Sequence, residues 1–222
     1  MLGAIRDRRI ITWDTDVDLG MLEIEKKKLS RAINELKKKG FHVFYDDILD
    51  RLIIMRFGRR INISFNKWMA GGKYAYAKMG TAKFYVIIAG LSSVQRLMLI
   101  PQREYLDYRL KLELMYYWPS LYRFLRLISI IPFKVRMAIS RIIKLIRKIL
   151  VKFTESKFIA FVVPSYHFRE FNTIEFYGTK FRVPSDTEKY LERHYGREWK
   201  TPQKDWHWLK DDGTLKIIHE HS

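Results

Sequence analysis

Three aspartates, Asp14, Asp16 and Asp18, alternate with other residues near the start of the chain. In a β-strand, side chains two residues apart point to the same face, so the three carboxylates would crowd together. Carboxylates at close range repel each other, and a divalent cation relieves that repulsion. Such oxygen ligands suit Mg²⁺ or Mn²⁺, which typically bridge carboxylates to substrate phosphates. The spacing predicts a metal site. The alternative is a solvated, acidic strand edge.

Several other kinds of site do not fit the sequence. The chain has no cysteine, which excludes disulfides, cysteine zinc sites and cysteine nucleophiles. No G-x-x-x-x-G-K-[ST] phosphate loop occurs, and the glycine and closing glutamate of a calcium loop are missing. We expect His167, which lies between aromatic residues, to be a packed histidine rather than a base, and His207, His219 and His221 to be solvated.

The elements around the aspartates indicate a mixed α/β (α+β) domain. Residues 10–13 read as a strand that leads into the acidic segment, and residues 22–39 as a helix with an apolar stripe that stops at Gly40. Residues 41–45, 51–57 and 60–65 read as strands, Ala70-Gly71-Gly72 as a turn, and residues 84–88 as one more strand. A helix followed by several strands favours a mixed sheet flanked by helices over a helical bundle.

A basic segment interrupts this pattern. The 222 residues, 48% of them apolar, suit one domain over residues 1–222, with residues 101–153 as a helical, basic amphipathic insertion within it. Residues 105–117 are expected to be helical. Residues 121–153 contain no acidic residue, and the polar tail after Trp208 is expected to be loose. The formal net charge of +18 implies anionic partners, which include nucleic acid, phosphorylated substrates and an anionic membrane surface.

The end of the basic segment has the pattern of an amphipathic helix. Its apolar residues follow helical spacing and its basic residues lie opposite them; the two sets are Ile139, Ile142, Ile143, Ile146, Ile149, Leu150 and Phe153, and Arg141, Lys144, Lys148 and Lys152. Such helices lie in the interface of anionic membranes. The alternatives are a helix packed on the domain and a nucleic-acid groove, the latter weakened by sparse aromatic residues. We see no signal peptide and no stretch long enough to span a bilayer.

Two blocks of sequence resemble a known family. The first is Leu2-Gly3-Ala4-Ile5-Arg6-Asp7 followed by Ile11-Thr12-Trp13-Asp14-Thr15-Asp16-Val17-Asp18. The second runs through Phe176-Tyr177-Gly178-Thr179-Lys180-Phe181-Arg182-Val183-Pro184-Ser185-Asp186 to Tyr190-Leu191, Tyr195-Gly196, Trp199 and Pro202. In order and spacing they resemble the opening and C-terminal blocks of the LicD/fukutin-type family, which has the nucleotidyltransferase fold.

The resemblance implies an enzyme that transfers phosphorus-containing groups. Its family members move phosphocholine or an alditol phosphate from a CDP-linked donor to a glycan, and the aspartates of the matching motif hold the metals. By this resemblance Asp14, Asp16 and Asp18 are the catalytic and metal-binding residues, with Mg²⁺ or Mn²⁺ as cofactor. Arg6 would face a phosphate and Gly3 would line the donor site, while Lys180 and Arg182 could meet the donor phosphate or the acceptor glycan.

Two differences from the family motif leave other functions open. The chain lacks the Gly-Thr that usually precedes the first leucine, and Asn62 occupies the place of a further aspartate, where it would be a neutral metal ligand. We expect a cytoplasmic enzyme, peripheral at an anionic membrane, that acts on a glycan or lipid-linked glycan, with nucleic acid an unlikely partner. The alternatives are a nucleotidyltransferase acting on RNA or a small molecule, and a catalytically degenerate relative that binds a membrane or a partner.

Overall fold

The computed structural model describes residues 1–12, 14, 16–56, 59–81, 83, 85–99, 130–154 and 157–219. The side chains of residues 16, 59, 85, 86 and 97 are outside this description. The helix expected over residues 105–117 and most of the predicted insertion, residues 101–129, also lie outside the described residues.

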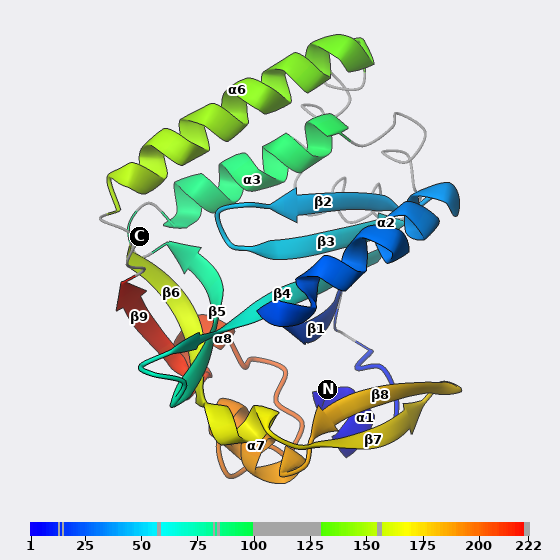
Figure 1. Cartoon of the computed structure of the whole chain (residues 1–222), viewed down its shortest axis with the longest axis vertical. Helices are drawn as coiled ribbons and strands as arrows, with labels where there is room; N and C mark the ends of the chain where they lie inside the picture. Colours follow the sequence, from blue (N-terminus) through cyan, green and yellow to red (C-terminus); the bar gives the residue numbers. More distant parts are fainter. Residues whose placement is uncertain are drawn as a thin grey trace.

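The elements confirm a mixed α/β fold (Figure 1). In chain order they are α1 (Leu2–Arg6), β1 (Asp16–Leu22), the 3₁₀ turn η1 (Glu23–Lys28), α2 (Leu29–Lys38), β2 (His42–Asp46), β3 (Arg51–Arg56), β4 (Arg59–Met69), β5 (Tyr74–Thr81), α3 (Tyr85–Leu99), α6 (Phe133–Lys152), β6 (Lys157–Pro164), the 3₁₀ turn η3 (Ser165–Phe168), β7 (Phe171–Phe176), β8 (Thr179–Pro184), α7 (Thr187–Tyr195), α8 (Trp208–Asp211) and β9 (Leu215–His219).

The long strand β4 joins the two halves of a seven-stranded sheet with the order β2-β3-β4-β5-β6-β9. Its first part, up to Asn66, pairs with β3 in antiparallel fashion and with β1 in parallel fashion. Its last residues, Lys67–Met69, pair instead with β5. The strands β7 and β8 form a separate two-stranded hairpin. Because β1 is held at β4 and not beside its chain neighbour β2, the acidic segment lies against the strand that carries Asn62.

The two faces of the β1–β4–β3–β2 half are covered differently. One face presents apolar side chains such as Leu52 and Phe65, and Leu29, Ile33 and Leu36 of α2 pack against it. On the other face Phe44 and Met55 pack against α3 and α6, which lie next to each other at one end of the molecule (Figure 1). Residues opposite each other in a sheet share a face, so Asp18, Asn62, Ile53 and Phe44 form one row on this second face.

Three of the predicted strands, those expected at residues 41–45, 51–57 and 60–65, are confirmed. The strands β2, β3 and β4 coincide with the expected ones, and β4 extends beyond the prediction to Met69. The turn at Ala70-Gly71-Gly72 is also present, with a hydrogen bond from the Gly72 amide to the Met69 carbonyl. Gly40 ends α2 in the left-handed conformation, and the Phe41 amide donates to the Leu36 carbonyl as expected for this type of helix end.

Four predictions were wrong. Residues 10–12 are not part of a strand. The helix expected from Leu22 begins only at Leu29, because residues up to Leu22 pair with β4 and η1 follows them. The strand expected at residues 84–88 is the start of α3, whose buried Ile88, Ser92 and Met98 follow helical spacing over a longer run. The tail is not loose, since β9 pairs with β6 and buries Ile218.

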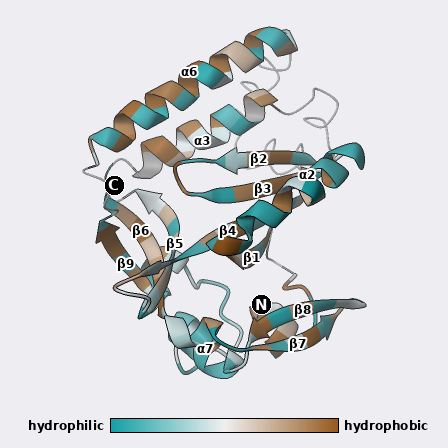
Figure 2. Cartoon of the chain, viewed as in Figure 1, coloured by the Kyte–Doolittle hydropathy of each residue, from teal (hydrophilic) through white to brown (hydrophobic). Residues whose placement is uncertain are grey.

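The helix α6 confirms the predicted amphipathic helix but not the direction of its apolar stripe. The residues buried against the domain are Arg136, Ser140, Ile143 and Arg147. Most of the apolar stripe instead faces outward, with Ile142 58% and Ile149 46% exposed, and Leu145 59% exposed beside them. Figure 2 shows these apolar residues along α6 interspersed with hydrophilic ones. None of the described helices combines the length and apolar character needed to cross a membrane.

Candidate active site

The parallel pairing of β1 and β4 brings Asp18 and Asn62 together. They are partners in the register, and the Asn62 side-chain amide donates to the Asp18 carboxylate over 2.9 Å. The neighbouring residues Leu19 and Ile61 point to the opposite face and pack with α2. This alternation of apolar and polar residues is what fixes Asp18 and Asn62 on the face away from α2.

The other two aspartates precede and begin the strand. Asp14 is exposed, and its amide donates to the Ile11 carbonyl over 3.1 Å, which makes a turn ahead of β1. Asp16 is the first residue of β1 and pairs in register with Arg60, but its side chain is outside the described part. Among the described side chains, no group of three or more histidines and acids has the arrangement of a metal site. The convergence of all three aspartates therefore stays a prediction.

The short helix α1 packs against the segment that leads to Asp14. Gly3 is buried, and a Cβ atom there would lie 2.6 Å from the Arg9 carbonyl oxygen, so this position needs glycine for a close backbone approach. The predicted role of Gly3 in the donor site is untested, and what the structure adds is its packing role. The carbonyl of Gly3 accepts the amides of Asp7 and Arg9, which turns the chain after the helix.

Arg6, at the end of α1, is held by its neighbour. Its Nε and Nη2 donate to the two Asp7 carboxylate oxygens, each over 2.8 Å. This hydrogen-bonded pair raises the pKa of Arg6 and lowers the pKa of Asp7. A guanidinium has five N–H donors, and Asp7 takes two, so Arg6 keeps donors for a phosphate while its orientation is fixed.

The C-terminal block reaches this region through Tyr195, the last residue of α7. Burial raises the pKa of its phenol to about 12, and the charges of Asp212, Asp18 and Asp14 add to the shift while Arg6 opposes it. Tyr195 thus lies within electrostatic range of both Asp14 and Asp18. From the sequence we predicted no role for Tyr195 in the site, and its place in the second family block was the one signal that could have indicated it.

Two histidines near this block have structural partners. His194 Nδ1 lies 2.8 Å from Asp212, which also holds Thr214. His167 is fully buried, with its Nδ1 2.8 Å from Asp186, so the expectation of a packed histidine is confirmed.

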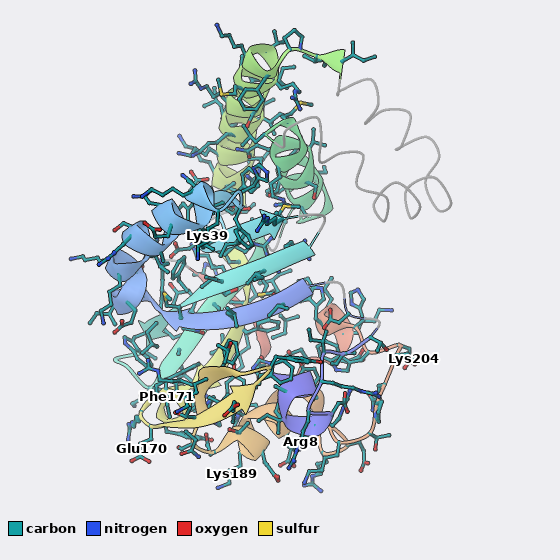
Figure 3. The ribbon with its side chains drawn as sticks, turned by 90° about the vertical axis from the view of Figure 1, so that its right-hand side faces the viewer. Arg8, Lys39, Glu170, Phe171, Lys189 and Lys204 are labelled. Atoms are coloured by element: carbon teal, nitrogen blue, oxygen red, sulfur yellow. The ribbon has the colours of Figure 1, made fainter. Side chains whose placement is uncertain are left out.

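The predicted substrate residues Lys180 and Arg182 lie on a different element. Both are exposed on β8, and the Arg182 guanidinium lies 4.9 Å from the centre of the Phe171 ring. The hairpin reaches the N-terminal segment, since the Ile10 amide donates to the Tyr177 hydroxyl over 3.4 Å. Figure 3 shows α1, this hairpin and α7 gathered below the sheet, with Arg8, Phe171 and Lys189 on or next to these three elements.

The described donor set is compatible with a hard divalent ion. Asp18 supplies carboxylate oxygens, and Asn62 supplies an amide oxygen if its side-chain amide turns by half a rotation, away from the present hydrogen bond. Asp14 and Asp16 belong to the same short segment. An all-oxygen set of this kind fits Mg²⁺ or Mn²⁺ better than zinc or copper.

Comparison with known proteins agrees with the first family block. Residues 1–74 match the family model described as LicD/FKTN/FKRP, nucleotidyltransferase domain. The matched span runs from α1 through β4 and contains Asp14, Asp16, Asp18 and Asn62. No curated protein and no solved structure matches the chain. The match supports a LicD-like family and, with it, a transferase of the phosphotransferase type in glycan modification. The second block lies outside the matched span.

Proposed function

We propose, from the LicD-like character of residues 1–74, that this chain is a metal-dependent phosphotransferase. It would move a phospho-alcohol group, phosphocholine or an alditol phosphate, from a CDP-linked donor to a glycan hydroxyl. The observation that carries the proposal is the contact of Asp18 with Asn62 on the face of the sheet away from α2. It supports a site where the matched motif, α1 and Tyr195 converge.

The proposed reaction is a displacement at phosphorus. The acceptor oxygen forms a bond to the phosphorus that carries the alcohol, and the bond from that phosphorus to the CMP oxygen breaks. CMP leaves with the bonding electrons, and the acceptor proton passes to a carboxylate of the aspartate segment. A bound divalent ion would supply neutralisation of the diphosphate charge.

The protein side chains would position the reactants. Asp14, Asp16 and Asp18, with Asn62 as a neutral ligand, would hold Mg²⁺ or Mn²⁺. Arg6, fixed by Asp7, would donate to a donor phosphate. The Tyr195 hydroxyl, like that of any tyrosine, is protonated near neutral pH, so it could donate a hydrogen bond to an anionic oxygen. Lys180 and Arg182 would contact the far end of a bound substrate.

A donor screen tests this proposal. CDP-choline, CDP-ribitol and CDP-glycerol would be incubated with the chain, a mixture of glycan acceptors, and Mg²⁺ or Mn²⁺, and CMP release measured. We expect release with at least one donor and none in EDTA. Absence of CMP release with every donor and both metals would reject the transferase and favour a relative that only binds a membrane or a partner.

The net charge of +18 motivates a second function, nucleotidyl transfer to RNA or to a small molecule. Such an enzyme would incorporate a nucleotide from a nucleoside triphosphate, and its RNA binding would weaken steeply with salt. Nucleotide incorporation with no CMP release from CDP-linked donors would replace the first proposal.

A further inference from the structure

A basic cavity lies on the same face of the sheet as Asp18 and Asn62. It has a volume of about 330 Å³, opens to the surface, and is lined by residues of β2, β3, α3 and α6. A smaller cavity of about 70 Å³ adjoins it and shares Ser92, Arg96 and Arg147. Further basic side chains of the larger cavity are Arg141 and Lys144. Its volume is in the range of small-ligand sites, and its walls combine apolar residues with convergent polar groups.

Arg147 and Asp46 form the fixed part of the wall. Arg147 is 3% exposed, and its Nη2 lies 2.9 Å from both Asp46 carboxylate oxygens. Burial opposes ionisation of Asp46, yet the charges of Arg147 and Arg51 hold the pKa of its carboxyl below the ordinary value. This pair also anchors α6 to β2, across 101 residues of sequence. Asp46 is thus already engaged by a cation.

Among the described residues, the hydrogen-bond partners of the Arg96 guanidinium are hydroxyls and not carboxylates. Its Nη1 donates to Ser92 over 2.6 Å and its Nη2 to Ser93 over 3.0 Å, and both partners are neutral hydroxyls. Burial and the nearby charges of Arg51, Arg60 and Arg147 together lower the pKa of Arg96 to about 10, while Asp46 opposes them. A half-buried guanidinium among other guanidiniums is costly unless an anion joins it.

The cavity lies on the same sheet face as the aspartate site, and its β3 wall is two strands away from β1. Ile53 lines the cavity and is the register partner of Asn62, which in turn pairs with Asp18. Neighbouring strands lie about 4.8 Å apart, so the β3 side of the cavity is about 10 Å from Asp18. That separation suits a sugar ring with a phosphate on its far side.

We propose that this cavity binds the phosphate of a phosphate-bearing sugar acceptor, with Arg96 and Arg141 as its ligands. The inference rests on the proposed function, because it assigns the cavity to the acceptor of that reaction. The donor diphosphate would instead lie at the aspartates with Arg6. The acceptor phosphate neutralises the excess cationic charge around Arg96 and orients the sugar hydroxyl toward Asp18.

Binding of glucose 1-phosphate to the full chain, measured by calorimetry in EDTA, tests the proposal. EDTA removes any contribution of a metal site, so the readout is independent of turnover. We expect binding that Arg96→Gln and Arg141→Gln each weaken about tenfold, the usual effect of losing one charge-assisted hydrogen bond. Arg96→Lys should retain part of the affinity. Methyl glucoside, which lacks the phosphate, should not bind.

The matched control is Arg31→Gln, an exposed arginine on α2, across the sheet from the cavity. Equal affinity loss in Arg31→Gln and Arg141→Gln would show a general charge effect and overturn the proposal, as would unchanged binding in both cavity variants. Arg141 is exposed, so Arg141→Gln decides the matter even if Arg96→Gln does not fold. CDP with Mg²⁺ should leave the binding unchanged, and displacement by CDP would assign the cavity to the donor.

Discussion

Asn62 lies next to Asp18. A carboxylate at position 62 would repel the Asp18 carboxylate strongly unless a metal ion were bound. The Asn62 amide gives Asp18 a hydrogen bond and brings no charge, so the two side chains can lie in contact with no ion between them. At the same scale, Gly3 allows α1 to approach Arg9 closely, and Asp7 fixes the direction of Arg6. These contacts position the candidate site before any ligand arrives.

Asn62→Asp should convert this contact into repulsion. We expect the melting temperature in EDTA to fall by roughly 2–8 °C, since about 1–2 kcal/mol of stability is lost with the hydrogen bond. Mn²⁺ should then raise the melting temperature of the variant more than that of the parent, because the ion binds the folded state with an added carboxylate. The comparison variant is Asn66→Asp, which makes the same substitution four residues further along β4. Equal metal responses in Asn62→Asp and the parent would contradict a metal site beside Asn62.

Asp50 has a strongly perturbed carboxyl, and it gives a pH prediction. Burial opposes its ionisation, but the hydrogen bonds from Lys26, Tyr45 and Lys67 hold its pKa at about 2. A carboxyl whose folded pKa lies below its unfolded value of 3.8 contributes stability above that value. This contribution is lost as the pH falls from about 4 through about 2.

Asp50→Asn should therefore destabilise the protein by about 1–2 kcal/mol at neutral pH and flatten the loss of stability between about pH 4 and pH 2. Urea unfolding at a series of pH values measures both effects. Asp47→Asn, whose partners Lys144 and Lys148 are more exposed, should change the profile much less. An acid profile of Asp50→Asn parallel to that of the parent would remove Asp50 as the cause.

At the scale of elements, local patterns predicted some parts of the fold and tertiary pairing decided others. The short, largely apolar runs at residues 51–57 and 60–65, bounded by turn residues, predicted β3 and β4. No local pattern could show that β1 pairs with β4. Because this pairing extends to Leu22, the helix expected from Leu22 begins later. The same limit applies to β9, because the tail sequence does not show that this segment pairs with β6.

The helix α6 shows a further limit of sequence patterns. Helical spacing defined an apolar stripe, but the buried ion pair of Arg147 with Asp46 turned the helix so that much of this stripe faces outward. Lys134, Arg141, Lys148 and Lys152 are also exposed along it. An exposed apolar stripe beside a basic one is the surface that interfacial helices present to anionic lipid. We therefore retain the proposal of a peripheral membrane enzyme.

Vesicle binding tests this role of α6. The chain should cosediment with phosphatidylserine-containing vesicles and not with purely zwitterionic ones. Ile142→Asn and Leu145→Asn together should weaken binding about tenfold or more, since each removes apolar area from the interface. Ile217→Asn, on β9 and 66% exposed, is a control of equal chemistry. Equal cosedimentation of the α6 variant and the parent would exclude this surface as the membrane contact.

At the scale of the whole molecule, the candidate site joins parts of the chain that are distant in sequence. The matched residues 1–74 contribute α1, β1 and β4, while Tyr195 comes from α7. Figure 1 shows the N-terminus beside the β7–β8 hairpin and α7, with α3 and α6 at the opposite end of the molecule. The sequence motifs identified both blocks, but only the fold places Tyr195 near the aspartates and the basic cavity on the same sheet face.

The central claim is that the aspartate segment carries metal-dependent transfer. The most direct measurement is CMP release from the active CDP-linked donor at saturating Mn²⁺, compared between the parent, Asp16→Ala, Asp18→Ala and the control Glu35→Ala on α2. Loss of metal and charge stabilisation should reduce the rate by about 1000-fold in both aspartate variants and leave the control unchanged. Turnover by Asp16→Ala and Asp18→Ala at the parental rate would contradict the claim.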